Sequence, residues 1–571
     1  MRLLYASRFF GTAFLTDLCV ALGEGAPFEA RPATGGTLAE ARRARESAAP
    51  VVLLGLPKLA LVLAPTLRDR LSLILDGAEG YDERRAARLA GLRVASFSFP
   101  LYSALRRVGA DAAQFSWAPR PVEASALQDA LAFVEPGAWP ARETLAMLRE
   151  RLGVTRFVTR APRGIAERVY GFAQGGAERL ADAEAAETLA RAGVFIAARA
   201  HSGLDGGFLD AMARGALVVA PPRGLAAEFL THGVDGLIEG RDIDGDLART
   251  KIGDAARRFC AQARRRFEED RERLRDFAHG RALSRRTIAR IVWPPATAGA
   301  ALSPEAREGG KRLRGDAKAD RPGAPLVTAA IVVRNARESF APTLASILAQ
   351  DYPNLEVVAV DGASSDGTRE EIAAHDDALD CWISEGDKGP YDGMNKAARH
   401  ARGRFLIFMN AGDFFAHERA VSEAFEGDAT PGADIVVGHH VYVDPNGVES
   451  LNKNADFDWT YNRLARGELS WEWWNGVPCG QAVFIRSELL REQPFDTSFR
   501  IAADHAFLYE ARRRGRRFAH CGGVIGVYTA GGLSSANDRK TAAEILRIAR
   551  EFGPREKIDA WFRKNLPIAL G

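Results

Sequence analysis

Short apolar runs alternate with amphipathic, helix-like segments along most of the chain. Such runs, bounded by turn residues, predict buried strands, and strands that alternate with helices predict parallel sheets covered by helices. The runs of the first half span residues 2–6, 51–54, 71–75, 94–97, 131–134, 156–159, 194–197 and 217–220. Those of the second half include residues 328–333, 355–360 and 404–409. The pattern predicts an α/β protein throughout.

One segment interrupts this alternation and divides the chain. Residues 294–324 are rich in Pro, Gly, Ala and charge, with little to bury, which predicts a linker. At 571 residues the chain is also too long for one core. The stretch before the linker, residues 246–292, is helix-like and rich in Arg and Glu. It could lie on a membrane surface, but acids interrupt the basic run, which favours a solvated helix closing the first half.

Charge and cysteine content narrow the classes of function. The formal net charge is +3, which gives no case for nucleic acid as a partner. The five cysteines show no metal-type spacing, as expected of reduced thiols in a cytoplasmic protein. No apolar run approaches the ~18–20 residues that span a bilayer. Arg8 and Asp17 interrupt the apolar N-terminus, which predicts a strand and a helix there instead of a signal peptide.

Acidic residues stand where three segments of the second half change character. Asp361 and Gly362 follow the run 355–360, and Asp413 follows the run 404–409 after a break at Gly412. Asp504 precedes a helix-like segment. Ligands of open α/β sheets bind at the carboxyl ends of the strands. We therefore expect a ligand site at this edge of the second sheet.

The second half resembles the family-2 glycosyltransferases of the GT-A fold. The resemblance spans roughly residues 325–535 and is carried, in order, by VAVDGASSDGT, SEGDKGPYDGMNKAARHARG, FMNAGD, CGQAVFIR, AADHAFL and GGLSS. It implies a GT-A domain over residues 325–571 that transfers a sugar from a nucleotide-sugar donor with inversion. The DKGPYDGMNK form is similar to the subgroup that builds bacterial surface polysaccharides.

The resemblance assigns expected roles to individual residues. Asp361 matches the aspartate that contacts the nucleotide base, Asp413 the metal-binding aspartate, and Asp504 the proposed general base. The remaining donor-site candidates are Asp387, Lys388, Asp392 and Asn410. The implied cofactor is Mg²⁺ or Mn²⁺, which neutralises the diphosphate leaving group. Gly412 stands where many members have another Asp, so one protein carboxylate is left to hold the ion.

Structural roles remain open for several of these positions. Asp361 could cap the following helix, a task for which Ser364 and Asp366 compete, and Asp504 could cap the helix that begins at His505. Lys396 and Arg399 are expected on a solvated helix face, and His439 and His440 in a structural role. Trp471, Trp473 and Trp474 could stack on sugar rings or pack in the protein.

The first half resembles the donor-side domain of family-4 glycosyltransferases, which have the two-Rossmann GT-B fold. The resemblance is carried by LDAMARG, VVA and HGVDGLI within residues 192–238, with Gly224 and Glu228 in register. It implies two Rossmann-like subdomains, residues 1–125 and 126–293. The family's two donor-binding glutamates fall at Ser202 and Asp210. The half is then either a retaining transferase with altered donor specificity or a non-catalytic module that binds an acceptor or a partner.

The two resemblances together imply partners. The donor is expected to be a UDP-sugar, and the acceptor a glycan or lipid-linked glycan of the capsule, lipopolysaccharide or exopolysaccharide type. Peripheral association with the inner face of the membrane is an alternative to a purely cytoplasmic location. The sequence makes no prediction of sugar, linkage or oligomeric state.

Overall fold

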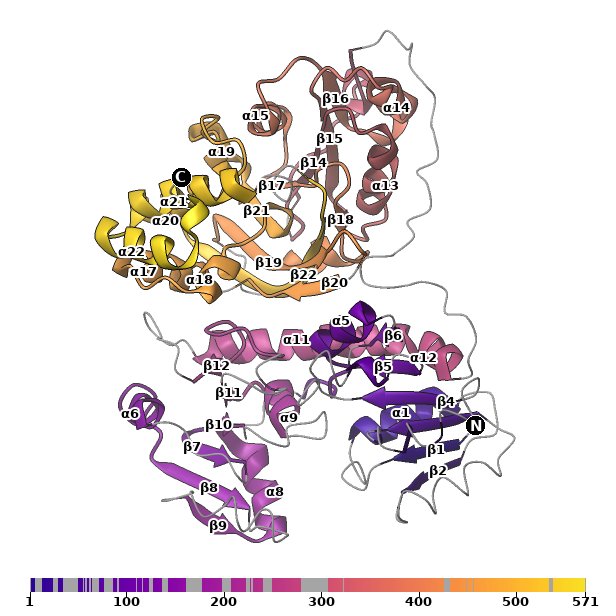
Figure 1. Ribbon diagram of the computed structural model, residues 1–571, viewed down its shortest axis with the longest axis vertical. Helices are drawn as coiled ribbons and strands as arrows, with labels where there is room; N and C mark the ends of the chain where they lie inside the picture. Colours follow the sequence, from indigo (N-terminus) through magenta and orange to yellow (C-terminus); the bar gives the residue numbers. More distant parts are fainter. Residues whose placement is uncertain are drawn as a thin grey trace. The chain divides into compact units, whose positions relative to one another are not determined.

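The computed structural model divides the chain into two compact units, Met1–Thr287 and Ile288–Gly571 (Figure 1). It describes residues 2–5, 13–23, 29–33, 50–54, 56, 59–60, 63, 71–75, 86–89, 92–108, 110–115, 117–122, 127–135, 142–160, 177–197, 207–221, 226, 229–239, 249–278, 307–321, 323–425, 432–447, 449–454, 456–532 and 538–569. Among these residues no helix combines the length and apolar character needed to cross a membrane. All five cysteines are free thiols.

The first unit begins with a six-stranded sheet in which every strand pair is parallel. Its strands are β1 (Arg2–Tyr5), β2 (Glu29–Pro32), β3 (Val51–Leu54), β4 (Leu71–Leu75), β5 (Arg93–Ser96) and β6 (Asp111–Gln114), in the order β2-β1-β3-β4-β5-β6. The described helices of this part include α1 (Ala13–Gly23) and α5 (Phe99–Arg107). β3 and β4 are buried at every position, as expected for strands of a covered parallel sheet.

A second six-stranded parallel sheet follows in the same unit. Its strands are β7 (Gln128–Val134), β8 (Arg156–Arg160), β9 (Glu178–Leu180), β10 (Ala192–Ile196), β11 (Leu217–Ala220) and β12 (Leu237–Ile238), in the order β12-β11-β10-β7-β8-β9. The helices α6 (Arg142–Glu150), α8 (Asp182–Arg191) and α9 (Gly207–Arg214) alternate with these strands. The order reverses between β7 and β10, as in a doubly wound sheet. The prediction of parallel α/β sheets is confirmed for the first unit.

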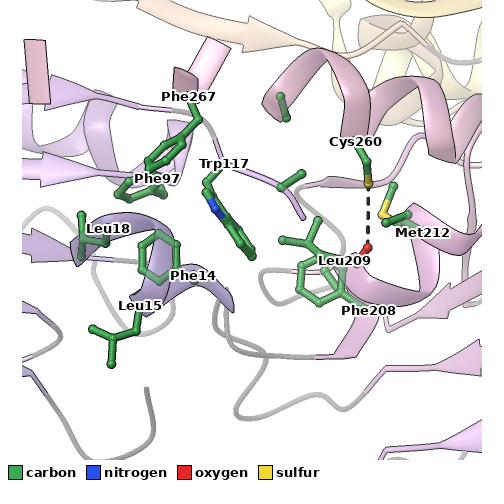
Figure 2. Close-up of a cluster of buried hydrophobic side chains, with 14 of the residues drawn as sticks. Phe14, Leu15, Leu18, Phe97, Trp117, Phe208, Leu209, Met212, Cys260 and Phe267 are labelled. Atoms are coloured by element: carbon green, nitrogen blue, oxygen red, sulfur yellow. Dashed lines mark hydrogen bonds between the residues drawn. The ribbon is translucent and has the colours of Figure 1, made fainter. Parts of the chain in front are cut away.

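Two helices close the first unit by returning to its first sheet. α11 (Arg249–Glu269) packs on α9, and α12 (Arg271–Ala278) packs on α1 and β4. Arg264 of α11 forms an ion pair with Asp17 of α1, and Asp17 Oδ2 also accepts a hydrogen bond from Trp117 Nε1 at 2.9 Å. Phe14, Phe97 and Trp117 of the first half of the unit lie in the same core as Phe208 and Cys260 of the second (Figure 2).

The solvated helix expected over residues 246–292 is wrong for the part that the structure describes. Ala256, Cys260, Ala263 and Phe267 recur at intervals of three and four residues and bury one face of α11. Cys260 Sγ donates to the Leu209 carbonyl of α9 (Figure 2). The basic and acidic residues therefore occupy the other faces of a core helix.

The second unit is built on one mixed sheet. Its main path runs β13-β16-β15-β14-β17-β21-β19-β22-β18, and β20 pairs with β19. The strands are β13 (Glu308–Gly309), β14 (Val327–Val333), β15 (Leu355–Asp361), β16 (Cys381–Ser384), β17 (Phe405–Phe408), β18 (Phe414–Phe415), β19 (Ile435–Val443), β20 (Glu449–Asn452), β21 (Val483–Arg486) and β22 (Phe518–Thr529). β16, β15, β14 and β17 are mutually parallel, so their carboxyl ends meet at one edge.

Helices cover both faces of this sheet (Figure 1). They are α13 (Arg337–Leu348), α14 (Thr368–Ala374), α15 (Pro390–His400), α16 (Ala420–Phe425), α17 (Phe457–Arg466), α18 (Trp471–Gly476), α19 (Ser487–Glu492), α20 (Ala503–Arg513), α21 (Asp538–Phe552) and α22 (Arg555–Asn565), with the 3₁₀ turns η4 (Lys311–Arg314), η5 (Asp376–Ala378), η6 (Gly480–Ala482) and η7 (Pro567–Ala569). Along β14, Ala330 and Val332 enter one core, while Ala329, Ile331 and Val333 enter the other. A strand buried on both faces is continuously apolar, which explains the run detected in the sequence.

Residues 307–321, which make up most of the described part of the expected linker, form a strap on the second unit. β13 pairs antiparallel with β16. Arg312 of η4 forms an ion pair with Glu356, which is fully buried on β15. Lys318 Nζ lies 2.9 Å from Asp380 Oδ2 and donates to the Leu355 carbonyl at 2.7 Å. The basic residues of this segment, which had suggested a solvated linker, are thus the ion-pair partners of buried acids.

The strap predicts where the second unit can be separated from the first. A fragment of residues 307–571 should fold cooperatively, and Arg312→Ala within it should cost about 3–5 kcal/mol in unfolding free energy, because Glu356 would remain buried without its cation. Urea denaturation measures the change. Arg404→Ala is the matched control, since Arg404 and Asp320 are both about half exposed and 3.8 Å apart, and it should cost under about 1 kcal/mol. Equal costs for the two variants would contradict the role of the strap.

Candidate active site

The carboxyl ends of β14, β15 and β17 bring the predicted acidic residues of the second unit to one edge. Val333 is in register with Asp361, and Asp361 with Ser384. The segment after β17, residues 410–413, follows the strand on the other side of β14. The parallel register is therefore what gathers residues that are far apart in sequence.

Asp361 is fully buried and its carboxylate is already hydrogen-bonded. Its oxygens accept from the Ser364 backbone N–H at 3.1 Å, from the Ser364 hydroxyl, and from the Ser384 hydroxyl at 2.6 Å. It does not cap α14, whose N-cap is Gly367. Asp361 thus closes the turn after β15 and ties it to β16, and its contact with a nucleotide base remains a prediction.

The predicted donor segment forms the start of α15. Asp387 Oδ1 accepts from the Gly389 N–H at 3.0 Å, and Asp392 Oδ2 accepts from the Lys388 N–H at 3.0 Å. These bonds place both carboxylates at the N-terminal turn of the helix and leave the Lys388 side chain exposed. Gly362 allows the close approach, because a Cβ there would collide with Asp387 Oδ2.

Lys396 does not lie on the solvated helix face that was expected. Its side chain is mostly buried, donates from Nζ to the Gly386 carbonyl at 2.6 Å, and lies 3.0 Å from Glu385 Oε1. A long basic side chain nearly two helical turns into α15 therefore fastens the loop that precedes the helix. Arg399 faces solvent at the other end of the helix, as expected.

Asp413 is a buried carboxylate at the end of the central strand β17. Its Oδ2 accepts from Gln481 Nε2 at 2.7 Å and its Oδ1 from the Thr529 N–H at 3.2 Å. Burial raises the pKa of Asp413 to about 7, although both hydrogen bonds act in the opposite direction. Gly412 has φ +101°, a conformation that strains other residues, and turns the chain so that Asp413 points inward.

Asp504 lies in the first turn of α20 and does not cap it. The N-cap is Ala502, with no side-chain cap. Asp504 Oδ1 instead accepts from the Tyr391 hydroxyl of α15 at 2.7 Å. The alternative of a helix cap is therefore excluded by the position of the residue in the helix.

A three-residue segment, Cys479-Gly480-Gln481, lies between Asp413 and Asp504. Gln481 donates to Asp413, and a Cβ on Gly480 would lie 3.2 Å from Asp504 Oδ2. Cys479 Sγ donates to Gln481 Oε1 at 2.7 Å. Burial raises the pKa of Cys479, with smaller contributions from the charges of Asp413 and Asp504. The thiol is therefore a neutral support that orients the Gln481 amide.

Sequence reasoning missed three residues that support the site. Gln481 and Tyr391 lie inside the motifs CGQAVFIR and DKGPYDGMNK, so their polar groups were visible but unassigned. Glu544 carried no signal at all. Its carboxylate accepts from the N–H groups of Arg500, Ile501 and Ala502 at 2.8–2.9 Å, which fixes the entry into α20.

The tryptophans considered for sugar stacking and the two histidines differ in burial. Trp473 is buried and donates from Nε1 to the Tyr509 hydroxyl at 3.0 Å, so it packs in the core. Trp471 is 50% exposed, and its ring lies edge-on to Trp561. His439 and His440 are buried in β19, and burial lowers the pKa of both. Neutral, buried imidazoles fit the structural role expected for them.

In the first unit only Asp210 of the four candidates lies within the described residues. Ser202, Gly224 and Glu228 fall outside them. Asp210 is in the first turn of α9 and reaches solvent. Partial burial nevertheless raises its pKa, and the charge of Arg214 one turn later acts in the opposite direction. α9 follows β10, next to the point where the strand order reverses.

The surroundings of Asp413 offer few ligands for a divalent cation. The described residues contain no group of three or more His, Cys, Asp or Glu side chains that could hold a metal. One further oxygen is available, because Asn410 Oδ1 is buried and no described group bonds to it. One carboxylate and one amide oxygen fit an ion such as Mg²⁺, which takes most of its ligands from water and substrate phosphates.

The family model for glycosyl transferase family 2 matches residues 328–493 of this chain. An uncharacterized glycosyltransferase of Mycobacterium tuberculosis is 32% identical over 104 residues, which cover 18% of this chain and 40% of that protein. A putative teichuronic acid biosynthesis glycosyltransferase of Bacillus subtilis, TuaG, is 33% identical over 92 residues, covering 16% and 36%. The match therefore spans about two fifths of the length of these curated relatives.

The chain is also similar to two characterised or solved transferases. The Escherichia coli enzyme WfgD, a UDP-Glc:α-D-GlcNAc-diphosphoundecaprenol β-1,3-glucosyltransferase, is 31% identical over 91 residues, covering 16% of this chain and 36% of that protein. A mannosyltransferase of Pyrobaculum calidifontis, solved with GDP-Man and Mn²⁺, is 23% identical over 46% of this chain and 78% of its own, with a TM-score of 0.33. That score is too low to support an inference. The family model and the curated relatives support a family 2 glycosyltransferase domain in the second unit.

The raised pKa of Asp413 predicts that this residue costs stability. The unfolded chain ionises Asp413 near its ordinary value of 3.8, whereas the folded protein does so only near 7. The contribution of Asp413 to the free energy of unfolding is therefore highest at acidic pH and falls as pH rises from about 4 to about 7. Asp413→Asn removes the ionisation, and the Gln481 amide can rotate to meet the new NH₂ group. In EDTA at pH 8 the variant should be more stable by roughly 2–4 kcal/mol, at roughly 1.4 kcal/mol per pKa unit.

Chemical denaturation of the full chain at pH 4.5 and pH 8 measures this difference. The gain should be small at pH 4.5, where Asp413 is protonated in the folded state. Asp377→Asn is the control, because the Asp377 side chain is 46% exposed on the same unit and should change stability by under about 0.5 kcal/mol at either pH. A loss of stability on Asp413→Asn at pH 8 would make the carboxylate a structural group.

Proposed function

We propose that the second unit transfers a sugar from a nucleotide-sugar donor to a hydroxyl of a cell-surface or lipid-linked glycan, with inversion at the anomeric carbon. One observation carries the proposal: Asp413 and Asp504 flank the same short segment, Cys479-Gly480-Gln481. One carboxylate is buried at a strand end, and the other lies at the start of a helix with Oδ2 beside a glycine. The proposal assigns the donor site to the first carboxylate and the acceptor site to the second, on either side of the reacting carbon.

Asp413 and Asn410 are the residues that would hold Mg²⁺ or Mn²⁺ at the donor site. When bound, the ion neutralises the charge that develops on the diphosphate as it leaves. Asp413 and its partner Gln481 also position the segment 479–481. The desolvated environment strengthens electrostatic interactions at this point, which favours stabilising a charge that appears during the reaction.

The start of α15 supplies the remaining donor contacts. The partial positive charge at a helix N-terminus favours a phosphate group. Lys388 is exposed there and adds a point charge, while Asp387 and Asp392 organise the turn. The preference for UDP follows from the relative WfgD, whose name gives UDP-Glc as donor and a diphosphoundecaprenol-linked sugar as acceptor. Asp361, behind this turn, orients the loop that would meet the base.

Asp504 is the general base of the proposed reaction. Its Oδ2 takes the proton of the acceptor hydroxyl as the hydroxyl oxygen attacks the anomeric carbon and the bond to the diphosphate breaks. One displacement from the face opposite the leaving group inverts the anomeric centre. The Tyr391 hydroxyl holds Oδ1, which leaves the other oxygen for the proton.

The first unit is proposed to bind a nucleotide sugar of its own. Asp210 reaches solvent in the first turn of α9, which follows β10. The strand order reverses between β7 and β10, and doubly wound sheets bind nucleotides at such a point. A carboxylate there accepts hydrogen bonds from ribose or sugar hydroxyls. Ser202, Gly224 and Glu228 are the further candidates for this site. A retaining transfer by this unit is one consequence, and a purely binding unit is the alternative.

Asp504→Asn tests the base in the full chain. The variant keeps the size and the hydrogen bond to Tyr391 but cannot take a proton. It should therefore transfer sugar to the acceptor, with release of nucleoside diphosphate, at least ~100-fold more slowly. Donor affinity, measured by calorimetry, should stay the same. A panel of nucleotide sugars with Mg²⁺ or Mn²⁺ first identifies the donor. Wild-type rates in Asp504→Asn, with Asp377→Asn as the surface control, would disprove the role of Asp504.

Asp210→Asn tests the proposed site of the first unit. Loss of the charged acceptor should weaken binding of that unit's nucleotide sugar by roughly 1–3 kcal/mol, the range for removing one partner of a charged hydrogen bond. Calorimetry on the full chain carrying Asp413→Asn and Asp504→Asn removes turnover in the second unit, and comparison of this background with and without Asp210→Asn assigns the change in binding to the first unit. The absence of any nucleotide-sugar binding attributable to the first unit would leave it as a partner-binding module.

A further inference from the structure

We infer that Tyr391 is a positioning residue that locks the proposed base Asp504 to the donor-side helix α15. The inference rests on the proposed function of the second unit and adds a residue to its machinery. The evidence is a three-way junction: the Tyr391 hydroxyl lies 2.7 Å from Asp504 Oδ1 and 2.5 Å from the Ile501 carbonyl oxygen. Tyr391 is 6% exposed, so water does not replace these partners.

The junction has one proton for two acceptors. Burial raises the pKa of Tyr391 well above its ordinary value, and the charge of Asp504 raises it further, so the hydroxyl stays protonated. While Asp504 is ionised, the Tyr391 proton is shared between its carboxylate and the Ile501 carbonyl. After Asp504 Oδ2 has taken the acceptor proton, Oδ1 still accepts from the Tyr391 hydroxyl, and the Ile501 carbonyl remains its second acceptor. The junction therefore stays hydrogen-bonded in both states of the base.

The surrounding contacts hold the junction from both sides. The Arg500 guanidinium donates to the Lys388 carbonyl, which is a second bond between the entry to α20 and the start of α15. On the opposite side Glu544 of α21 accepts from the N–H groups of Arg500, Ile501 and Ala502. The segment that carries Asp504 is thereby fixed relative to the loop proposed to hold the donor. A base must keep this geometry to within a fraction of an ångström, because small displacements cost large factors in rate.

The aromatic ring of Tyr391 contributes separately to the core. It lies 5.5 Å from the Phe495 ring, between centroids, and belongs to the same hydrophobic cluster as Phe408 and Phe507. Tyr391→Phe keeps this packing and removes only the hydroxyl. Tyr509→Phe is a matched control: Tyr509 is buried in the same cluster, lies on α20 itself, and its hydroxyl accepts from Trp473 without contacting Asp504.

A double-mutant cycle on the full chain tests whether Tyr391 acts through Asp504. Tyr391→Phe should lower kcat ~10-fold with the donor KM unchanged, since the donor contacts remain. In the Asp504→Ala background it should lower the rate no further, because the group that it positions is gone. Tyr509→Phe should leave kcat within ~2-fold in both backgrounds. Equal losses from Tyr391→Phe with and without Asp504, or a change in donor KM alone, would overturn the inference.

A second arm needs no substrate and separates this inference from the proposed function. Hydrogen exchange of peptides from α15 and α20 in urea measures how firmly the junction holds the two helices. Tyr391→Phe should lower the urea midpoint in the wild-type background and by a smaller amount in Asp504→Ala, whereas Tyr509→Phe should lower it equally in both. If no donor is turned over but this coupling is present, the junction stands and the proposed function fails. If the Tyr391 effect is the same in both backgrounds, the junction itself fails.

Discussion

The hydrogen-bonded burial of Asp413 is the constraint on which the proposed site depends. Its side chain joins η6 through Gln481 and the end of β22 through Thr529, while its carbonyl accepts from Thr343 of α13. Asp413, at the end of β17, therefore links three elements that are distant in sequence. The two hydrogen bonds offset only part of the cost of burying the charge, as the raised pKa shows. A carboxylate kept at such a cost fits a group whose charge is used when a cation or a ligand arrives.

From Asp413 a continuous set of contacts leads to the start of α15. Gln481 and Gly480 lead to Asp504, Asp504 leads to Tyr391, and Tyr391 lies beside the turn of Asp392. Each step is a hydrogen bond or a close backbone approach between ordered elements, and the strands and helices at both ends are packed in apolar cores. Groups carried by such elements keep their distances better than groups on long loops, which a two-substrate displacement requires.

The sequence predicted the acids of this site and missed their supports for one physical reason. Asp361 and Asp413 follow strong apolar runs, and strand ends are where ligand groups stand, so position along the chain was informative. Lys396, Gln481 and Glu544 act through partners that the fold brings near, 10, 68 and 42–44 residues away. No one-dimensional pattern records those partners. Asp361 is the opposite case. Its motif suggested contact with a nucleotide base, whereas the structure shows its carboxylate bonded to Ser364 and Ser384, a structural role that the sequence did not exclude.

The errors of the sequence-based predictions have a common cause: basic residues were expected to be exposed to solvent. The strap 307–321, the helix α11 and Lys396 were each expected on the surface. The side chains of Arg312, Arg264 and Lys396 are nevertheless only 10–11% exposed, and each forms an ion pair. In a chain this rich in arginine, composition does not distinguish a solvated cation from an internal one. A cation is internal where a buried acid needs it as a partner, as Glu356 needs Arg312. The strap 307–321 therefore belongs to the second unit, and a fragment cut at residue 325 would lose Arg312 and Lys318, the cations paired with the buried acids Glu356 and Asp380.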